Sequence, residues 1–222
     1  MFPFRDRRQA GRMLASELLG VAPRGQVVVL GLPRGGIPVA FEVARALEAP
    51  LDAFAVRKVG APGHEEYAIG ALASGGIEYL DHERIGALGV SLEDVRSTIA
   101  AETAELERRE REYRDTRPVA DLRHKVVILV DDGLATGATM LAAVRAVQMR
   151  GPEQIIVAVP VATREACDLL RSEGADCRCV ATPEPFLAVG AWYRDFSQTS
   201  DNEVRALLDD ATAWIPVAPI PS

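Results

Sequence analysis

Cysteine, histidine and aromatic residues are scarce in this chain. It has three cysteines, three histidines and an aromatic content of 5% over 222 residues. An odd number of cysteines does not suit a disulfide framework. Cys177 and Cys179 lie two apart in a predicted strand, so their thiols face the same side, and no Cys or His cluster nearby would complete a metal site. We therefore expect buried, reduced thiols in a cytoplasmic protein.

Positive net charge and long apolar runs are also missing. The formal net charge of −7 argues against a nucleic-acid-binding surface. No apolar run is long enough to span a membrane, and residues 1–5 lack the basic-then-apolar order of a signal peptide. Neither Gly-x-x-x-x-Gly-Lys nor Gly-x-Gly-x-x-Gly occurs. The sequence thus predicts neither a nucleic-acid partner nor a membrane partner.

The most informative stretch is Lys125–Met140, whose sequence is K-V-V-I-L-V-D-D-G-L-A-T-G-A-T-M. Val126–Val130 is an unbroken apolar run that is too short for a helix. Such a run favours a central strand of a parallel sheet, buried on both faces. Asp131 and Asp132 end this strand, and a loop of small residues leads into a helical pattern. The stretch predicts a strand, a loop and a helix start, with two carboxylates at the strand end.

This junction favours an anion. Free backbone N–H groups and the helix dipole attract negative charge at a helix N-terminus. Thr136 and Thr139 add hydroxyl donors, and Gly137 allows a close approach to the backbone. We therefore predict a monophosphate-binding loop made of Ala135, Thr136, Gly137, Ala138 and Thr139. The two aspartates would repel that phosphate, so they must face sugar hydroxyls or a cation. A phosphate and a diol together predict a site for a ribose 5-phosphate.

Residues 127–139 resemble the signature of the type I phosphoribosyltransferases, which bind phosphoribosyl pyrophosphate (PRPP). In that family the paired acids hold the ribose 2- and 3-hydroxyls, and the loop that follows holds the 5-phosphate. The resemblance implies these roles for Asp131, Asp132 and residues 135–139. It also implies a Mg²⁺ cofactor that Asp131 and Asp132 hold indirectly. Gly133 departs from the signature, since a branched apolar residue is usual there. A plain strand-to-helix connection with acidic residues is the alternative.

A second strand, glycine loop and helix start lies near the N-terminus. Gln26–Gly31 predicts a buried strand, and a helix follows from about Pro38 to Leu47. Arg34, in the loop between them, can bind phosphate oxygens with two parallel hydrogen bonds, and the paired glycines expose amides. In the resembled family the loop after the first core strand binds pyrophosphate. The resemblance implies this role for Pro33, Arg34, Gly35 and Gly36.

Leu51–Val56 predicts a third core strand, which ends in Arg57 and Lys58. The resemblance implies that both cations bind pyrophosphate, and a solvated strand end is the alternative. Residues 58–80 resemble the mobile loop that closes over the substrates in this family. We expect residues 60–66 to form a loop, and residues 67–73 and 77–80 to form a hairpin. His64 is the candidate for proton transfer there, or simply a solvated histidine.

The remaining pattern predicts a doubly wound α/β fold. Strands over 154–159 and 176–181 bring the parallel sheet to about five strands, with crossover helices and ligands beyond the carboxyl ends of the strands. Further helices are expected over 6–19, from Ser91 to about 115, over 163–172 and from Ser200 onward. We expect one domain over residues 1–222. Its core would span about 20–182, and the N-terminal segment and residues 183–222 would form a small hood.

Aromatic residues gather after the last predicted strand. In the 6-oxopurine branch of the resembled family, an aromatic residue before a Val-Gly pair stacks on the base and a nearby Asp contacts its edge. Phe186, Val189-Gly190 and Asp195 are similar, but their spacing differs. We expect Phe186 or Trp192 to stack on the base and Asp195 to contact it, with a packed terminal segment as the alternative. Ala135 replaces an acid of the 6-oxopurine enzymes, so the loop is more similar to the adenine branch.

The resemblance implies a Mg²⁺-dependent phosphoribosyltransferase that transfers ribose 5-phosphate from PRPP to a nitrogenous base and releases pyrophosphate. Its catalytic residues would be Asp131, Asp132, Arg34 and Lys58. A non-catalytic PRPP-binding regulator is the alternative, although it would be expected to lack Arg34, Lys58 or the mobile loop. A magnesium phosphatase would need a second acidic cluster, which the later strands lack. We expect a homodimer or larger homo-oligomer that serves nucleotide salvage in the cytoplasm.

Overall fold

The computed structural model describes residues 3–21, 23, 25–62, 64–114 and 120–213. At its centre lies a five-stranded parallel sheet with the strand order β2-β1-β6-β7-β8. The predicted doubly wound α/β core is therefore confirmed. The strands of this sheet are β1 (Val27–Gly31), β2 (Leu51–Ala53), β6 (Val126–Val130), β7 (Gln154–Val161) and β8 (Asp176–Ala181).

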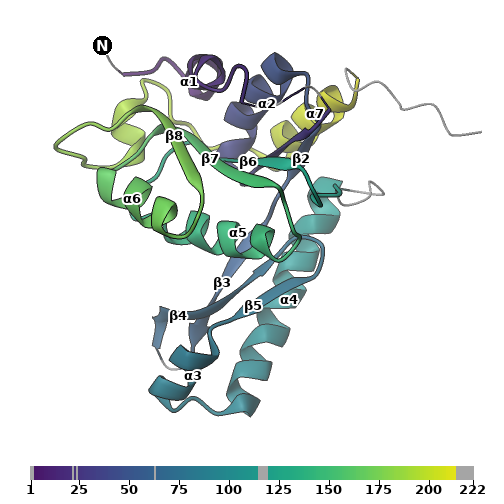
Figure 1. Cartoon of the computed structure of the whole chain (residues 1–222), viewed down its shortest axis with the longest axis vertical. Helices are drawn as coiled ribbons and strands as arrows, with labels where there is room; N and C mark the ends of the chain where they lie inside the picture. Colours follow the sequence, from purple (N-terminus) through teal and green to yellow (C-terminus); the bar gives the residue numbers. More distant parts are fainter. Residues whose placement is uncertain (1–2, 22, 24, 63, 115–119, 214–222) are drawn as a thin grey trace, which may run out of the picture.

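Helices cover both faces of this sheet (Figure 1). One face packs against α1 (Arg7–Ser16), α2 (Gly36–Leu47) and α7 (Asp201–Thr212), and the other against α5 (Ala138–Gln148) and α6 (Arg164–Ser172). Successive side chains of a strand point to opposite faces. Ile128 and Val130 accordingly lie in the first apolar cluster, and Val127 and Leu129 lie in the second. Burial on both faces explains why the β6 sequence is apolar throughout.

The strand order reverses between β1 and β6. From β1 the chain crosses to β2 on one side, whereas from β6 it crosses to β7 and β8 on the other. Gly31 and Val130 are paired at the carboxyl ends of the two strands. Such a reversal opens a crevice beyond the strand ends, because the two connections leave in opposite directions. The loops that follow β1 and β6 therefore lie side by side.

The predicted core strand Leu51–Val56 is too long at its C-terminal end. The core strand β2 stops at Ala53, and the Phe54 amide donates to the Gly31 carbonyl at 2.9 Å. The Phe54 side chain is buried, so the chain turns out of the core sheet at this point. A separate antiparallel sheet follows, in the order β3-β4-β5. Its strands are β3 (Val56–Ala61), β4 (His64–Ala73) and β5 (Ile77–Leu80), and the helices α3 (His82–Leu88) and α4 (Leu92–Arg114) come next.

Residues 60–66, expected as a loop, are mostly strand. β3 runs to Ala61, and β4 starts at His64, with an irregular register around Gly60. The predicted hairpin of β4 and β5 is confirmed. This second sheet has an apolar core of its own with α3 and α4, and it projects from the main sheet (Figure 1). The His64 side chain lies outside the described part, so its role stays a prediction.

Side chains cap the helices where the sequence predicted caps. The amides of Asp94 and Glu203 donate to the hydroxyls of Ser91 and Ser200, both at 3.1 Å. No helix in the described ranges is long and apolar enough to cross a membrane. The three cysteines are free thiols, and Cys177 and Cys179 face the same apolar cluster, as predicted.

A buried carboxylate joins α1 to α2. Only 1% of the Glu42 side chain is exposed, and its oxygens lie 3.3 Å from Arg8 Nη1 and 3.2 Å from Arg12 Nη1. Arg45 also contacts Glu42, and the guanidinium groups of Arg8 and Arg45 lie over the Phe41 ring. Charged hydrogen bonds of this kind fix the position of α1 on α2, because the carboxylate has no access to water.

We expect Glu42→Gln to destabilise the fold by about 2 kcal/mol, because the amide keeps the shape and loses the charged hydrogen bonds. The melting temperature should fall by about 4–8 °C for a chain of this size. Glu107→Gln is the matched control, since the Glu107–Arg111 pair is exposed on both sides and should contribute little. Equal melting temperatures for the two variants would contradict a structural role of Glu42.

Candidate functional site

Two adjacent carboxylates lie at the carboxyl end of β6, as the sequence predicted. The Asp131 carboxylate accepts a hydrogen bond from the Asp132 amide at 2.8 Å. The Asp132 carboxylate accepts from Arg7 Nε at 2.9 Å, with side-chain exposures of 11% for Arg7 and 15% for Asp132. Asp132 thus has a counterion from α1, whereas Asp131 forms no ion pair within the described residues.

Burial raises the pKa of Asp131 well above its ordinary value, and the neighbouring Asp132 raises it further. The hydrogen bond from the Asp132 amide and the charge of Arg7 lower the pKa of Asp131. Burial also raises the pKa of Asp132, and the charge and hydrogen bond of Arg7 oppose that rise. Because the charged pair is costly here, it should bind a group that donates hydrogen bonds or carries positive charge.

We expect Asp131→Asn to be more stable than the wild type at neutral pH. The pKa of Asp131 is higher in the folded than in the unfolded state, so the folded state binds protons more tightly. The wild type should therefore lose stability relative to the variant as pH rises from about 4. Melting curves of both proteins from pH 4 to pH 8 test this. A variant that is less stable at every pH would show that the Asp131 carboxylate supports the fold.

The loop after β1 packs directly against the acid pair. A Cβ atom on Gly35 would lie 2.1 Å from Asp132 Oδ2, and one on Gly36 would lie 2.9 Å from Asp131 Cα. Both positions therefore require glycine for steric reasons. The Leu32 amide donates to the Val130 carbonyl at 2.9 Å, which ties this loop to the end of β6. The Pro33–Arg34 peptide bond is cis. The structure thus brings residues 33–36 and the two aspartates together.

Arg34 points toward the C-terminal helix. Its Nη1 lies 3.5 Å from Asp201 Oδ2, at the start of α7. The Tyr113 hydroxyl donates to the other oxygen of Asp201 at 2.7 Å, and burial raises the pKa of Tyr113. About a third of each side chain of the Arg34–Asp201 pair is exposed. A ligand in the crevice can therefore reach Arg34, while Asp201 holds it in place.

Two helices begin in this crevice, and glycines stand at their N-caps. Gly35 precedes α2 and Gly137 precedes α5, and neither helix has a side-chain cap. Gly137 has a φ of 74°, a conformation that favours glycine. The other five α-helices in the described ranges have a capping Asp, Ser or Thr. In α2 the amides of Gly36 and Ile37 already donate to the carbonyls of Leu32 and Arg34, at 3.0 and 3.2 Å. The first turn of α5 is therefore the more open of the two to an anion in the crevice.

The predicted phosphate-binding loop surrounds the start of α5. Thr136 and Thr139 are exposed, so their hydroxyls are accessible to a ligand. The Ala135 carbonyl accepts from the Thr163 hydroxyl at 2.7 Å, and the Leu134 amide donates to the Val161 carbonyl at 2.9 Å. These bonds anchor the loop to β7 and to the start of α6. Residues 135–139 thus form a fixed loop with exposed threonines, and it leads into a helix whose N-cap residue has no side chain.

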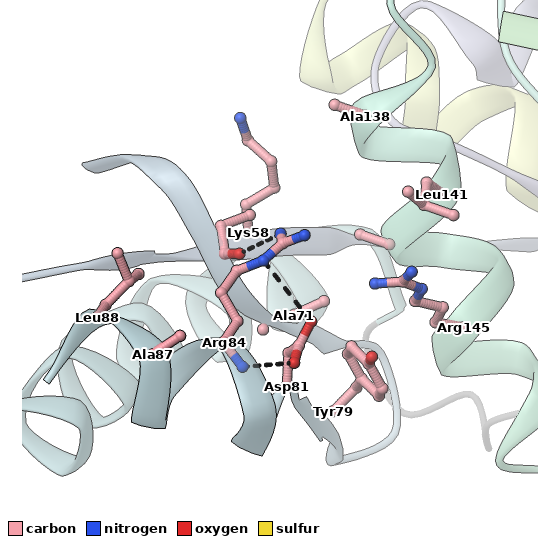
Figure 2. Close-up of a pocket in the computed structure, with 13 residues that line it drawn as sticks. Lys58, Ala71, Tyr79, Asp81, Arg84, Ala87, Leu88, Ala138, Leu141 and Arg145 are labelled. Atoms are coloured by element: carbon pink, nitrogen blue, oxygen red, sulfur yellow. Dashed lines mark hydrogen bonds and ion pairs between the residues drawn. The ribbon is translucent and has the colours of Figure 1, made fainter. Parts of the chain in front are cut away.

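Arg57 and Lys58 lie on the second sheet, and on opposite faces of β3. Arg57 Nε lies 2.5 Å from Glu102 Oε2 on α4, so its charge is already neutralised away from the crevice. Lys58 is exposed and borders a cavity together with Ala138 at the start of α5. The structure therefore places Lys58 at the same cavity as Ala138 of the predicted phosphate-binding loop (Figure 2), and it does not place Arg57 there.

The two terminal segments meet over the acid pair. Phe4 pairs with Tyr193, and the Tyr193 hydroxyl donates to the Asp132 carbonyl at 2.6 Å. Arg7 Nη1 donates to the Ser197 carbonyl at 2.7 Å, and its guanidinium lies 4.0 Å from the centre of the Phe196 ring. Burial raises the pKa of Tyr193, which keeps its hydroxyl a donor. These contacts hold the N-terminal and C-terminal segments over Asp132.

The three residues predicted to contact a base are not gathered around one space. Phe186 and Trp192 are half-buried and pack against the cluster of Phe4 and Tyr193. Asp195 is exposed, and its carboxylate accepts from the Ser197 amide at 3.0 Å. These contacts agree with the alternative of a packed terminal segment. A base-contacting role for the three residues stays a prediction.

Packing explains why position 133 has a glycine instead of the branched apolar residue of the signature. A Cβ atom there would lie 2.5 Å from Val189 Cγ1 and 3.1 Å from Val161 Cγ1. Val189 belongs to the short 3-10 helix Val189–Trp192 of the terminal segment. The apolar volume that a branched residue would supply at position 133 is therefore supplied by Val189. The contact of Val189 with Gly133 joins the terminal segment to the loop after β6.

Sequence reasoning missed Arg7, Tyr193 and Asp201. Each contacts a predicted site residue through a pairing that spans 60 residues or more. Arg7 was assigned only to a helix that covers the sheet, since neighbouring arginines at 5, 8 and 12 are indistinguishable from it. The one available signal was Asp6, whose carboxylate caps α1 and so places Arg7 at the first turn.

The fold and the two loops define a doubly wound α/β protein whose loops after β1 and β6 meet at an acid pair where the strand order reverses. Residues 5–184 match the family model described as a phosphoribosyl transferase domain. The chain therefore belongs to the phosphoribosyl transferase family, of type I, as its signature predicted.

Several known proteins are similar to this chain in sequence or in fold. The crystal structure of TT1426 from Thermus thermophilus has a TM-score of 0.85 and 43% identity, covering 93% of this chain and 98% of that one. A Mycobacterium tuberculosis protein that is provisionally named a phosphoribosyl transferase is 41% identical over 208 residues, 94% of this chain. The chain spans about half, 47%, of that relative's length. A Neisseria gonorrhoeae protein with bound ppGpp has a TM-score of 0.51 at 15% identity over 95% of this chain and 98% of that one, which shows the fold alone.

Proposed function

We propose that this protein transfers ribose 5-phosphate from PRPP to a nitrogenous base and releases pyrophosphate. The observation that carries the proposal is the pair of adjacent carboxylates at the end of β6, which lies between the glycine loop after β1 and the start of α5, a helix without a side-chain cap. PRPP has the matching order of groups, with a 5-phosphate, a ribose diol and a pyrophosphate. The loop at 135–139 would hold the 5-phosphate, Asp131 and Asp132 the ribose, and residues 33–36 the pyrophosphate.

The chemistry in this proposal depends on charge placement. The bond from ribose C1 to pyrophosphate breaks as the base nitrogen attacks, and positive charge develops on the ribosyl ring. The carboxylates of Asp131 and Asp132 would stabilise that charge. Arg34 and Lys58 would bind the departing pyrophosphate, and Asp201 would keep Arg34 in position. Arg7 would limit the repulsion between the two carboxylates.

We propose Mg²⁺ as the cofactor. Within the described residues no group of three or more His, Cys, Asp or Glu side chains is placed to hold a metal ion. Two carboxylates suffice for Mg²⁺ when substrate phosphates and water complete its shell. The donor set therefore fits Mg²⁺ that arrives with the substrate, with Asp131 and Asp132 as its indirect protein partners. When bound, the ion would neutralise charge on the pyrophosphate.

PRPP with Mg²⁺ at a hundredfold excess over its dissociation constant should stabilise the fold by about 2.7 kcal/mol. For a chain of this size the melting temperature should rise by about 5–10 °C. Ribose 5-phosphate is the matched control, since it lacks pyrophosphate and should give a smaller shift. A missing shift at millimolar PRPP would contradict the assignment of the crevice.

Product analysis tests the reaction itself. The protein is incubated with PRPP, Mg²⁺ and one base at a time, beginning with adenine because the loop at 135–139 is more similar to the adenine branch. We expect pyrophosphate release that depends on one base, together with the matching nucleoside monophosphate. PRPP binding without release for any base would favour the non-catalytic regulator instead.

A further inference from the structure

All three cysteines of the chain lie in one cluster at the edge of the core sheet. Cys167 belongs to α6, and Cys177 and Cys179 belong to β8, the last strand in the sheet order. The Sγ atoms of Cys167 and Cys177 lie 2.9 Å apart, and the two thiols share a hydrogen bond. A disulfide has an S–S bond of about 2.05 Å. A small rotation of the two side chains can therefore bring these sulfurs to bonding distance.

The positions of the three cysteines limit how they can pair. Cys177 and Cys179 lie two residues apart on the same face of β8, which separates their Cβ atoms by about 6.6 Å. A disulfide needs Cβ atoms about 3.5–4.5 Å apart, so these two cannot pair without bending the strand. Cys167 faces both of them from α6 and forms a hydrogen bond with each. Cys167 is therefore one partner in any disulfide of this cluster.

Cys177 is the more reactive of the two possible partners. The hydrogen bond with Cys167 lowers the pKa of the Cys177 thiol despite its burial, and the charge of Arg171 lowers it further. Arg171 Nη2 also donates to the Cys177 carbonyl at 3.2 Å. In contrast, the hydrogen bond with Cys167 and burial raise the pKa of the Cys179 thiol. Because the thiolate is the nucleophile in thiol oxidation, the cluster favours reaction at Cys177.

The cluster lies close to the surface of the molecule. Cys167 and Cys177 are 1% and 4% exposed, whereas Cys179 is only partly buried. The cover over the pair is α6, a helix of nine residues that packs on the edge strand. Short surface elements open locally far more often than the whole fold does. Hydrogen peroxide, the smallest hydroperoxide, can reach the pair in such an opening.

We propose that Cys167 and Cys177 form a reversible disulfide when the chain meets a hydroperoxide. The Cys177 sulfur attacks a peroxide oxygen, the O–O bond breaks, and the leaving hydroxide takes up the Cys177 proton as water, which gives a sulfenic acid. The Cys167 sulfur then attacks the Cys177 sulfur. The S–O bond breaks, and the hydroxide leaves as water with the Cys167 proton. Two thiols and one hydrogen peroxide thus give one disulfide and two waters, and a thiol reductant reverses the oxidation.

The disulfide ties α6 to β8 beside the predicted phosphate-binding loop. Cys167 lies one turn along α6 from Thr163, whose hydroxyl donates to the Ala135 carbonyl at 2.7 Å. Ala166 packs against the same loop, because a Cβ atom on Gly137 would lie 3.3 Å from the Ala166 Cβ. The disulfide therefore fixes the helix that anchors this loop. Its formation does not depend on the transfer reaction.

Peptide mapping tests this pairing directly, because trypsin separates the three cysteines into residues 165–171, 172–178 and 179–194. The folded chain is treated with one equivalent of hydrogen peroxide, and its remaining thiols are alkylated in denaturant before digestion. We expect the free thiols to fall from three to one per chain. Peptides 165–171 and 172–178 should be linked, and Cys179 should be alkylated. Dithiothreitol should restore all three thiols.

Two controls separate the cluster from unspecific oxidation. Cys179→Ser should form the same link and keep no free thiol, and it should melt within a few degrees of the wild type. The wild type unfolded in guanidinium chloride should give a mixture of links, because nothing then positions the thiols. Three free thiols in the treated folded chain, a link that includes peptide 179–194, or links between two chains would each overturn the proposal. The same single link in the unfolded chain would also overturn it, because proximity in sequence would then select the pair.

Discussion

Turnover should fall by about a hundredfold or more when Asp131 and Asp132 are both replaced by Asn, which corresponds to roughly 3 kcal/mol of lost transition-state stabilisation. The two asparagine side chains keep the shape of the aspartates. The side chain at position 131 can still accept a hydrogen bond from the backbone amide of residue 132, and the side chain at position 132 still faces Arg7. They remove the negative charge that complements a positive ribosyl ring. The melting temperature at neutral pH should not fall, because the buried charges are themselves costly.

The chain offers a matched control for this pair. Asp209 and Asp210 are also adjacent aspartates, and both are exposed at the end of α7. Asp209→Asn with Asp210→Asn makes the same change in net charge and should leave kcat and KM unchanged. If the Asp131 and Asp132 double variant keeps its turnover, the two acids support only the structure, and the proposed chemistry is wrong.

Gly35→Ala should lower kcat/KM for PRPP by about a hundredfold, because a displacement of about 1 Å in a positioned site can have that effect. The new Cβ would lie 2.1 Å from Asp132 Oδ2, so either the loop or the carboxylate has to move. The Gly35 backbone has φ −61° and ψ −32°, which alanine adopts freely, so the effect would be purely steric. Steady-state kinetics with PRPP as the varied substrate measure the loss.

Gly86→Ala is the matched control for Gly35→Ala. Gly86 lies in α3, and a Cβ there would meet no atom within 4 Å. Its kinetics should equal those of the wild type, and its stability should rise slightly, since alanine favours a helix. A Gly35→Ala variant with wild-type kcat/KM would show that the loop after β1 does not contact the substrate.

The parts of the fold with strong local signals could be predicted from the sequence. Val126–Val130 is apolar on both faces, and only a central strand buries both. The loop at 135–139 and the caps at Ser91 and Ser200 could also be predicted from local sequence. Glycine allows a turn at its own position, and a capping hydroxyl bonds to an amide only two or three residues further on. These elements were predicted within a few residues of their observed bounds.

The remaining features depend on contacts between distant residues. The strand after Leu51 was extended too far, because the apolar sequence continues through Val56 while the chain changes sheets at Phe54. Arg7 and Asp201 join the site from the two terminal segments, and nothing in their local sequence distinguishes them from exposed charges. Alternation along β3 places Arg57 and Lys58 on opposite faces, although they were expected to act together.

The two helices that begin with glycine have a consequence for the stability of the unliganded chain. Glycine at an N-cap position costs a helix roughly a few tenths of a kcal/mol relative to serine or aspartate. The starts of α2 and α5 lack such caps, and they follow the neighbouring strands β1 and β6 on opposite faces of the sheet. Under the proposed function, a phosphate bound at the start of α5 would complete that helix in the way that a serine or aspartate completes the others. A side chain that capped α5 would then compete with the phosphate, so selection for stability and selection for binding would oppose each other at this position.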